Sequence, residues 1–429
     1  MPPELAPAVR AETVIGFSEQ GRPLTVQFLP TNPSATLRVL LLAGQHGDEP
    51  LPRQALGAFI EAHPDYPNLE LAVLPTLNPD GAARNRRGNA HGLDLNRDNA
   101  LLESAEVRAL HGFVRTWRPH AVIDLHTYPT RRQQLVKQGL VYAHDVFLDV
   151  PTHPNAPRTL PGAFLREVLP TLNAKGVLAG RYTLVTPSGR VRHSTPDVRD
   201  ARNALSLRYG CFTVLLEART PETSRQHARV LNAVRRALAH TLRWLERHRS
   251  ALRLPAALPE GVVVKTRYKA SSQPLTLAFA DADTDQVRHV TLPGPYTPQL
   301  EPTETVTPPW AYAVPHTAEP LLEVLRRHGI TLATAQDASY PVERYTVEAL
   351  RPSARSERAP RALELRVERL STLLTAYELA PVNAETALAL TTFLEPASKY
   401  ALHRFAGLMT LREKTAFPIL RVHEPVPPT

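Results

Sequence analysis

The stretch that decides the fold is residues 39–50, Val-Leu-Leu-Leu-Ala-Gly-Gln-His-Gly-Asp-Glu-Pro. Its first five residues are apolar without interruption, as in a strand that is covered on both faces of a sheet. His46 and Glu49 follow in the loop after this strand, so an imidazole and a carboxylate can meet at one metal ion. The pair alone is a weak signal, because a histidine and a glutamate three residues apart also occur by chance.

A further histidine strengthens the prediction of a metal site. His126 comes directly after a second, mostly apolar run, residues 121–125. Two histidines and one carboxylate leave the fourth tetrahedral position of Zn²⁺ open, which distinguishes a catalytic zinc site from a closed structural one. We therefore predict a zinc hydrolase with one Zn²⁺ ion bound by His46, Glu49 and His126.

Several further motifs follow in a fixed order along the chain. They are Asn78-Pro79-Asp80-Gly81, Arg86-Arg87-Gly88-Asn89, Gly92-Leu93-Asp94-Leu95-Asn96-Arg97 and the apolar run 212–216 that ends at Glu217. With H-x-x-E, with His126 and with an opening strand pair around residues 17–24, this set resembles the M14 zinc carboxypeptidases. The resemblance covers roughly residues 12–250 and depends on order and spacing, since no single motif is specific.

The resemblance implies roles at the metal. His46, Glu49 and His126 would be the ligands, and Asp94 would accept a hydrogen bond from the second ring nitrogen of a ligand histidine, which fixes its orientation. Glu217 would be the general base that takes a proton from the zinc-bound water and passes it to the leaving amine. A carboxylate at the end of a buried parallel strand lies at the sheet edge where α/β proteins bind ligands.

The resemblance also implies how a peptide would bind. Asn96 and Arg97 would hold its free C-terminal carboxylate, because a guanidinium pairs with a carboxylate through two parallel hydrogen bonds. Arg87 would face the oxyanion that develops during the reaction, and Arg86 competes for this role. Arginine is abundant in the chain, so the assignment depends on position within the motifs.

The chain departs from the family pattern in two places. Relatives commonly have a tyrosine about two dozen residues before the catalytic glutamate, where it covers the substrate, and this chain has none between Tyr182 and Tyr209. Either Tyr182 reaches the site from a longer flap, or an arginine or histidine such as His193 replaces it. Asp98 stands where relatives more often have asparagine.

Three functions are compatible with these motifs. The first is a zinc metallocarboxypeptidase that hydrolyses the C-terminal amide bond of a peptide. The second is an amidohydrolase of N-acyl amino acids or murein peptides, of the succinylglutamate desuccinylase or aspartoacylase type, although those relatives usually lack the Asn-Pro-Asp-Gly motif found at Asn78. The third is an inactive peptidase scaffold that serves binding, which we rank last because all the ligands, the base and the arginines are present.

The hydrophobic pattern predicts an α/β fold for the first half, with a mixed, mostly parallel sheet flanked by helices. One helix has an apolar face from Val230 to Leu245, with Thr220 expected as its N-cap and Pro221 as its first residue. Beyond it, residues 343–349 and 363–370 alternate apolar and charged side chains, as strands with one wet face do. We therefore expect a catalytic domain at 1–250, a linker at 251–261 and a smaller, mostly β accessory domain at 262–429.

Composition limits the remaining possibilities. The chain has 429 residues, 43% of them hydrophobic, and a formal net charge of +9. We expect no nucleic-acid partner, because the basic residues form no recognisable binding motif, and no membrane partner, because no apolar run is long enough to span a bilayer. Cys211 is the only cysteine and is expected to be a buried packing residue. The first residues lack a signal-peptide pattern, so we expect a cytoplasmic protein.

Overall fold

The computed structural model describes most of the chain as two compact units. The described residues are 11–29, 32, 35–62, 65–131, 139–157, 159–185, 191–193, 195–271, 274–282, 284, 286–292, 296–336, 339–351 and 362–424. The first unit comprises Met1–Leu254 and Tyr268–Gln299, and the second comprises Pro255–Arg267 and Leu300–Thr429.

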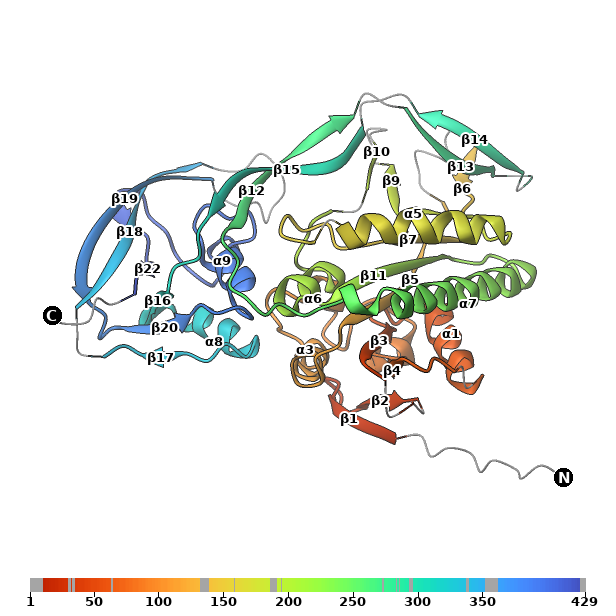
Figure 1. The fold of residues 1–429 in the computed structure, drawn as a ribbon, viewed down its shortest axis with the longest axis horizontal. Helices are drawn as coiled ribbons and strands as arrows, with labels where there is room; N and C mark the ends of the chain where they lie inside the picture. Colours follow the sequence, from red (N-terminus) through yellow and green to blue (C-terminus); the bar gives the residue numbers. More distant parts are fainter. Residues whose placement is uncertain are drawn as a thin grey trace. The chain divides into compact units, whose positions relative to one another are not determined.

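An eight-stranded mixed sheet forms the centre of the first unit (Figure 1). In spatial order its strands are β1 (Ala11–Phe17), β2 (Pro23–Phe28), β4 (Leu69–Leu74), β3 (Leu37–Ala43), β5 (Ala121–Tyr128), β11 (Phe212–Arg219), β7 (Val146–Asp149) and β8 (Ala179–Arg181). The four central strands β4, β3, β5 and β11 are parallel to one another. The apolar runs at 39–43, 121–125 and 212–216 predicted β3, β5 and β11, because strands covered on both faces contain few polar residues.

Helices cover both faces of this sheet. On one face lie α1 (Pro50–Glu61), α5 (Thr159–Ala174) and α7 (Ser224–Arg247), packed on alternate residues of the strands. On the other face lie α3 (Ala105–Trp117) and α6 (Ala201–Tyr209). Shorter helices are α2 (Pro79–Arg84), η1 (Leu95–Arg97) and η2 (Arg249–Ala251). The predicted α/β fold with a mixed sheet between helices is confirmed.

The start of α7 differs from the prediction. Its apolar face is buried as expected, from Val230 to Leu245. However, the helix begins at Ser224, and its N-cap is Thr223, whose hydroxyl accepts a hydrogen bond from the backbone of Gln226. Thr220 lies four residues before the helix, and its hydroxyl donates to the backbone carbonyl of Tyr128 at 2.9 Å.

Two smaller sheets complete the first unit. One is formed by β14 (Val287–Leu292), β13 (Leu275–Asp281) and β6 (Leu140–Tyr142). The other is formed by β12 (Val262–Ser271), β15 (Tyr296–Val306), β10 (Val191–His193) and β9 (Thr183–Val185). These pairings bring Tyr268–Gln299 into the first unit, whereas the prediction placed all of 262–429 in the accessory domain. The cause is long-range strand pairing, which hydrophobic periodicity does not reveal.

The second unit is mostly β, as predicted. Its sheet has the order β17 (Ala333–Thr334), β20 (Tyr377–Pro381), β16 (Ala311–Pro315), β22 (Leu420–Val422), β18 (Ser339–Arg351) and β19 (Ala362–Leu373), and β21 (Thr415–Ala416) also pairs with β18. The helices of this unit are η3 (His316–Ala318), α8 (Glu319–Arg327), α9 (Ala387–Leu394) and η4 (Leu402–Arg404). None of the helices in the described part of the chain has both the length and the apolar character needed to cross a bilayer.

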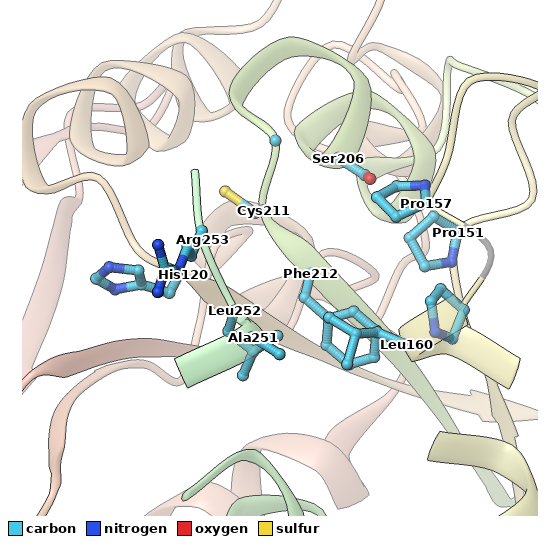
Figure 2. Close-up of a pocket in the computed structure, with 12 residues that line it drawn as sticks. His120, Pro151, Pro157, Leu160, Ser206, Cys211, Phe212, Ala251, Leu252 and Arg253 are labelled. Carbon is cyan, nitrogen blue, oxygen red and sulfur yellow. The ribbon is translucent and has the colours of Figure 1, made fainter. Parts of the chain in front are cut away.

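A small cavity of about 110 Å³ lies at the amino end of β11 (Figure 2). Cys211 and Phe212 line it together with mostly apolar residues of the neighbouring segments. The thiol of Cys211 donates to the backbone carbonyl of Pro119, and burial raises its pKa to about 12. Cys211 is therefore a buried packing residue, as expected, at the edge of the sheet opposite to Glu217.

Candidate metal centre

The loop after β3 places His46 and Glu49 at the carboxyl edge of the sheet. Gly44, with a φ of 67°, turns the chain sharply at the end of β3, and α1 begins directly after Glu49. Gly47 packs so closely on α2 that a Cβ atom there would lie 2.0 Å from the carbonyl carbon of Gly81. Only glycine fits this contact, so the H-G-D-E loop and the N-P-D-G turn depend on each other.

Asn78 joins these loops. Its side-chain oxygen caps α2 by accepting a hydrogen bond from the backbone of Gly81 at 2.8 Å. Its amide nitrogen donates to the backbone carbonyls of Gln45 and Arg87, each at 3.2 Å. The N-P-D-G motif therefore holds the loop of His46 and the loop of Arg87 together.

The three predicted ligands converge on one point. His46 Nδ1 lies 2.7 Å from Glu49 Oε1 and 3.1 Å from His126 Nδ1, and His126 Nδ1 lies 3.2 Å from Glu49 Oε2. Ligands of a tetrahedral zinc ion with bonds of 2.0–2.1 Å are separated by about 3.3 Å, so the set has nearly the spacing that the ion requires. All three side chains are buried, and they form a cluster that could hold a metal ion.

The second nitrogen of each imidazole faces a carboxylate. His46 Nε2 lies 3.1 Å from Asp94 Oδ1, which is the contact that the sequence predicted. His126 Nε2 lies 3.1 Å from Asp124 Oδ1, and the amide of Gln45 donates to both oxygens of Asp124. An Nε2–H that donates to a carboxylate leaves the Nδ1 lone pair free for a metal.

Asp124 was missed by the sequence analysis, although a signal was present. It lies two residues before His126 on β5, and residues two apart on a strand share one face of the sheet. Its carboxylate is 2% exposed. A buried carboxylate on the same face as a ligand histidine is a candidate partner for that histidine.

The protonation of the cluster shows how strongly its groups interact. Burial raises the pKa of Glu49, but hydrogen bonds with His126 and His46 outweigh burial and hold it well below the usual value. Burial lowers the pKa of His126, but Asp124 and Glu49 outweigh burial and raise it well above 6.5. Two imidazoles surrounded by buried carboxylates form an electrostatic environment that favours a divalent cation.

Glu217 lies beside the metal ligands. In the parallel pairing of β5 and β11 it is directly opposite His126, so both side chains are on the same face of the sheet. On its other side, β7 places Phe147 opposite Glu217. Burial, the largest influence, raises the pKa of Glu217 to about 7, a value suited to a group that both takes and gives a proton near neutral pH.

Arg87 is close to the metal ligands and half exposed. Its Nε donates to Asp94 Oδ2 at 3.0 Å, and its Nη1 lies 3.7 Å from Glu49 Oε1. Arg86, the competitor for the oxyanion role, contributes a backbone contact, its N–H donating to the carbonyl of Gly81. The position of Arg87 favours it over Arg86, and its oxyanion role stays a prediction.

Asn96 and Arg97 sit at the same edge but differ in exposure. Asn96 is nearly buried, its side-chain oxygen accepts from the backbone of Ala201 at 2.8 Å, and its amide nitrogen lies 3.2 Å from His126 Nε2. Arg97 is exposed, and its Nη1 donates to the carbonyl of Asn96 at 2.6 Å. The structure thus uses Asn96 to join η1 to α6, and carboxylate binding by the two residues stays a prediction.

The two departures from the family pattern have structural counterparts. His193 is buried, with Nδ1 near the hydroxyl of Thr183 at 3.2 Å, and the ring of Tyr182 lies 5.8 Å from that of Phe147. Residues 186–190 and 194 of this stretch lie outside the described residues. Asp98 has a structural role, because its carboxylate accepts hydrogen bonds from the backbone of Glu103 and Ser104 before α3.

Known proteins resemble this chain over part of its length. No family model matches it. It is 26% identical over 233 residues to carboxypeptidase 2 of Trichophyton tonsurans, which covers 49% of this chain and 43% of that protein. It is 32% identical over 124 residues to murein peptide amidase A of Vibrio campbellii, which covers 29% of this chain and 47% of that protein. The chain thus spans less than half the length of these curated relatives.

A solved structure also overlaps with the chain. The metallo-carboxypeptidase from Pseudomonas aeruginosa in complex with (2-guanidinoethylmercapto)succinic acid covers 56% of this chain and 64% of its own, with 23% sequence identity and a TM-score of 0.45. The sequence relatives that bear carboxypeptidase names confirm the predicted resemblance to the M14 zinc carboxypeptidases.

Proposed function

We propose that this protein is a zinc-dependent carboxypeptidase that hydrolyses the C-terminal amide bond of a peptide. The observation that supports it most is the convergence of His46, Glu49 and His126, with Glu217 opposite His126 on the neighbouring strand. A divalent cation bound by these three side chains would polarise the scissile carbonyl and lower the pKa of water so that it attacks at neutral pH. The donor set, two imidazoles and a carboxylate, is one that zinc prefers.

The protein's own groups have distinct tasks in this proposal. Glu217 takes a proton from the attacking water and gives it to the leaving amine, and its raised pKa of about 7 suits both transfers. Asp94 and Asp124 hold the imidazoles in one orientation. Arg87 offers a fixed positive charge for the developing oxyanion. Arg97, exposed at the same edge, pairs with the free carboxylate of the peptide.

A murein peptide is the second candidate substrate. The similarity to a protein named murein peptide amidase A is a reason to include this substrate beside ordinary peptides. Both reactions use the same metal, base and water, so the site geometry supports them equally. They differ only in the groups that flank the scissile amide.

A substrate panel tests the proposal. The purified, zinc-loaded protein is incubated with peptides that have a free C-terminus, the same peptides with an amidated C-terminus, murein tripeptides, and N-acyl amino acids. Release of the last residue from the free peptides but not from the amidated ones is the expected result, because the amide removes the charge that Arg97 would pair with. Cleavage confined to N-acyl amino acids would contradict the proposal, and cleavage confined to murein peptides would favour the second substrate.

A further inference from the structure

We propose that the β13–β14 hairpin holds the strands β6, β7, β9 and β10 in place, and that these strands form one wall of the substrate site beside Glu217. In this proposal Phe279 and Tyr142 are positioning residues for substrate binding. This inference rests on the proposed hydrolase function, because the wall matters to catalysis only if a substrate binds next to Glu217. The hairpin belongs to the segment Tyr268–Gln299, which is separated in sequence from Met1–Leu254 but is part of the same compact unit (Figure 1).

The hairpin joins the first unit through a regular strand pairing. β13 pairs antiparallel with β6, and Phe279 lies directly opposite Tyr142. Phe279 is fully buried, and Leu277 and Phe279 share one apolar cluster with Tyr142 and Phe147. The hairpin is therefore packed into the first unit by a small core of its own.

A row of aromatic rings connects this core to the candidate site. Phe279 stacks on Tyr142 with ring centroids 5.6 Å apart, and Tyr142 meets Phe147 edge-on at 5.7 Å. Phe147 lies opposite Glu217 in the pairing of β7 with β11. Aromatic pairs at these separations attract each other in preferred geometries. The position of Phe279 therefore influences β7, the strand that carries Phe147 next to Glu217.

The hydroxyl of Tyr142 fixes a second part of the wall. It accepts a hydrogen bond from the backbone N–H of Val185 at 2.9 Å and donates to the carbonyl of Thr183 at 3.2 Å. Both residues are in β9, which pairs with β10, and β10 pairs in turn with β15 at Thr297. The strands β9 and β10 are thus held by Tyr142 on one side and by the segment Tyr268–Gln299 on the other.

These contacts predict an effect on substrate binding without an effect on the metal. Phe279 lies in β13 and Tyr142 in β6, whereas His46 and Glu49 follow β3 and His126 lies in β5. If these strands are loosely held, the site binds the substrate and the transition state more weakly by the same factor. KM then rises, and kcat is unchanged.

Tyr142→Phe is the most specific test, because it removes one oxygen and leaves the ring stack in place. We expect KM to rise by roughly fivefold, while kcat and zinc content stay within about twofold of the wild type. Tyr312→Phe is the matched control, because it also removes a buried hydroxyl that donates a hydrogen bond, to Glu395 in the second unit, and it should leave KM unchanged. An unchanged KM in an active, folded Tyr142→Phe protein would overturn the inference.

Amide hydrogen exchange gives a readout that does not depend on turnover. The described amides of β9 and β10 should exchange faster in Tyr142→Phe and in Phe279→Leu than in the wild type. Val287→Ala, at an exposed position of the same hairpin, should leave them unchanged. If these amides exchange at the wild-type rate in both variants, the hairpin does not hold the wall and the inference fails. A wild type without turnover would instead contradict the proposed function, and exchange would still decide the structural part.

Discussion

Replacing Asp124 by asparagine should weaken zinc binding, although Asp124 is not a predicted ligand. The carboxylate lies 3.1 Å from His126 Nε2 and accepts two hydrogen bonds from Gln45. Asparagine has the same shape, but its oxygen is a neutral acceptor, and its amide nitrogen would face the amide nitrogen of Gln45. The imidazole of His126 would lose a charged partner and part of its fixed orientation.

The size of the effect follows from the role of such partners. Loss of a carboxylate behind a metal-bound histidine costs about 10- to 100-fold in metal affinity, which is roughly 1.4–2.7 kcal/mol. Competition with a chromophoric chelator measures zinc affinity directly. Asp98→Asn is the matched control, because Asp98 is also buried and hydrogen-bonded in the first unit, but its carboxylate binds the backbone of Glu103 and Ser104 before α3. A folded Asp124→Asn protein with wild-type zinc affinity would refute the role assigned to this residue.

Three further predictions concern single groups. Glu217→Gln should retain zinc while kcat falls by about 100-fold or more, and unchanged turnover would exclude Glu217 as the base. Burial lowers the pKa of His153 to about 3, so below pH 6.5 the unfolded chain binds a proton that the folded chain does not. The protein therefore becomes less stable as the pH decreases. In urea titrations from pH 7.5 to 5.5, His153→Gln should lose roughly 1 kcal/mol less stability than the wild type, and equal losses would contradict this sign. The native Cys211 thiol, with its pKa raised to about 12, should resist a thiol reagent at pH 8 and react after unfolding, whereas rapid labelling of the native protein would show that it is accessible.

The sequence predicted the parts of the site that depend on strand ends. Parallel buried strands have a strong apolar signal, and His46, just after β3, and His126, near the end of β5, both reach the carboxyl edge of the sheet. Asp94 was found through its motif, and its contact with His46 is present. For these residues, local pattern and motif order contain enough information.

The sequence did not predict what depends on side chains meeting across distant segments. The partnership of Asp124 with Gln45 and the use of Asn96 to hold Ala201 involve ordinary polar residues without a periodic pattern. The return of Tyr268–Gln299 to the first unit depends on pairing with β6 and β10, and strand pairing over long separations has no local signature. The start of α7 was misplaced because two threonines three residues apart are equally good caps in sequence.

Zinc content in the wild type and in His46→Ala tests the central claim most directly. Elemental analysis of the dialysed, folded proteins should find about one zinc ion per wild-type chain and almost none in the variant, because His46 is one of the three protein ligands we propose. Asp98→Asn, measured in the same way, should keep its zinc. Full zinc occupancy in folded His46→Ala, or turnover of a C-terminal amide by the metal-free wild type, would contradict a catalytic metal at His46, Glu49 and His126.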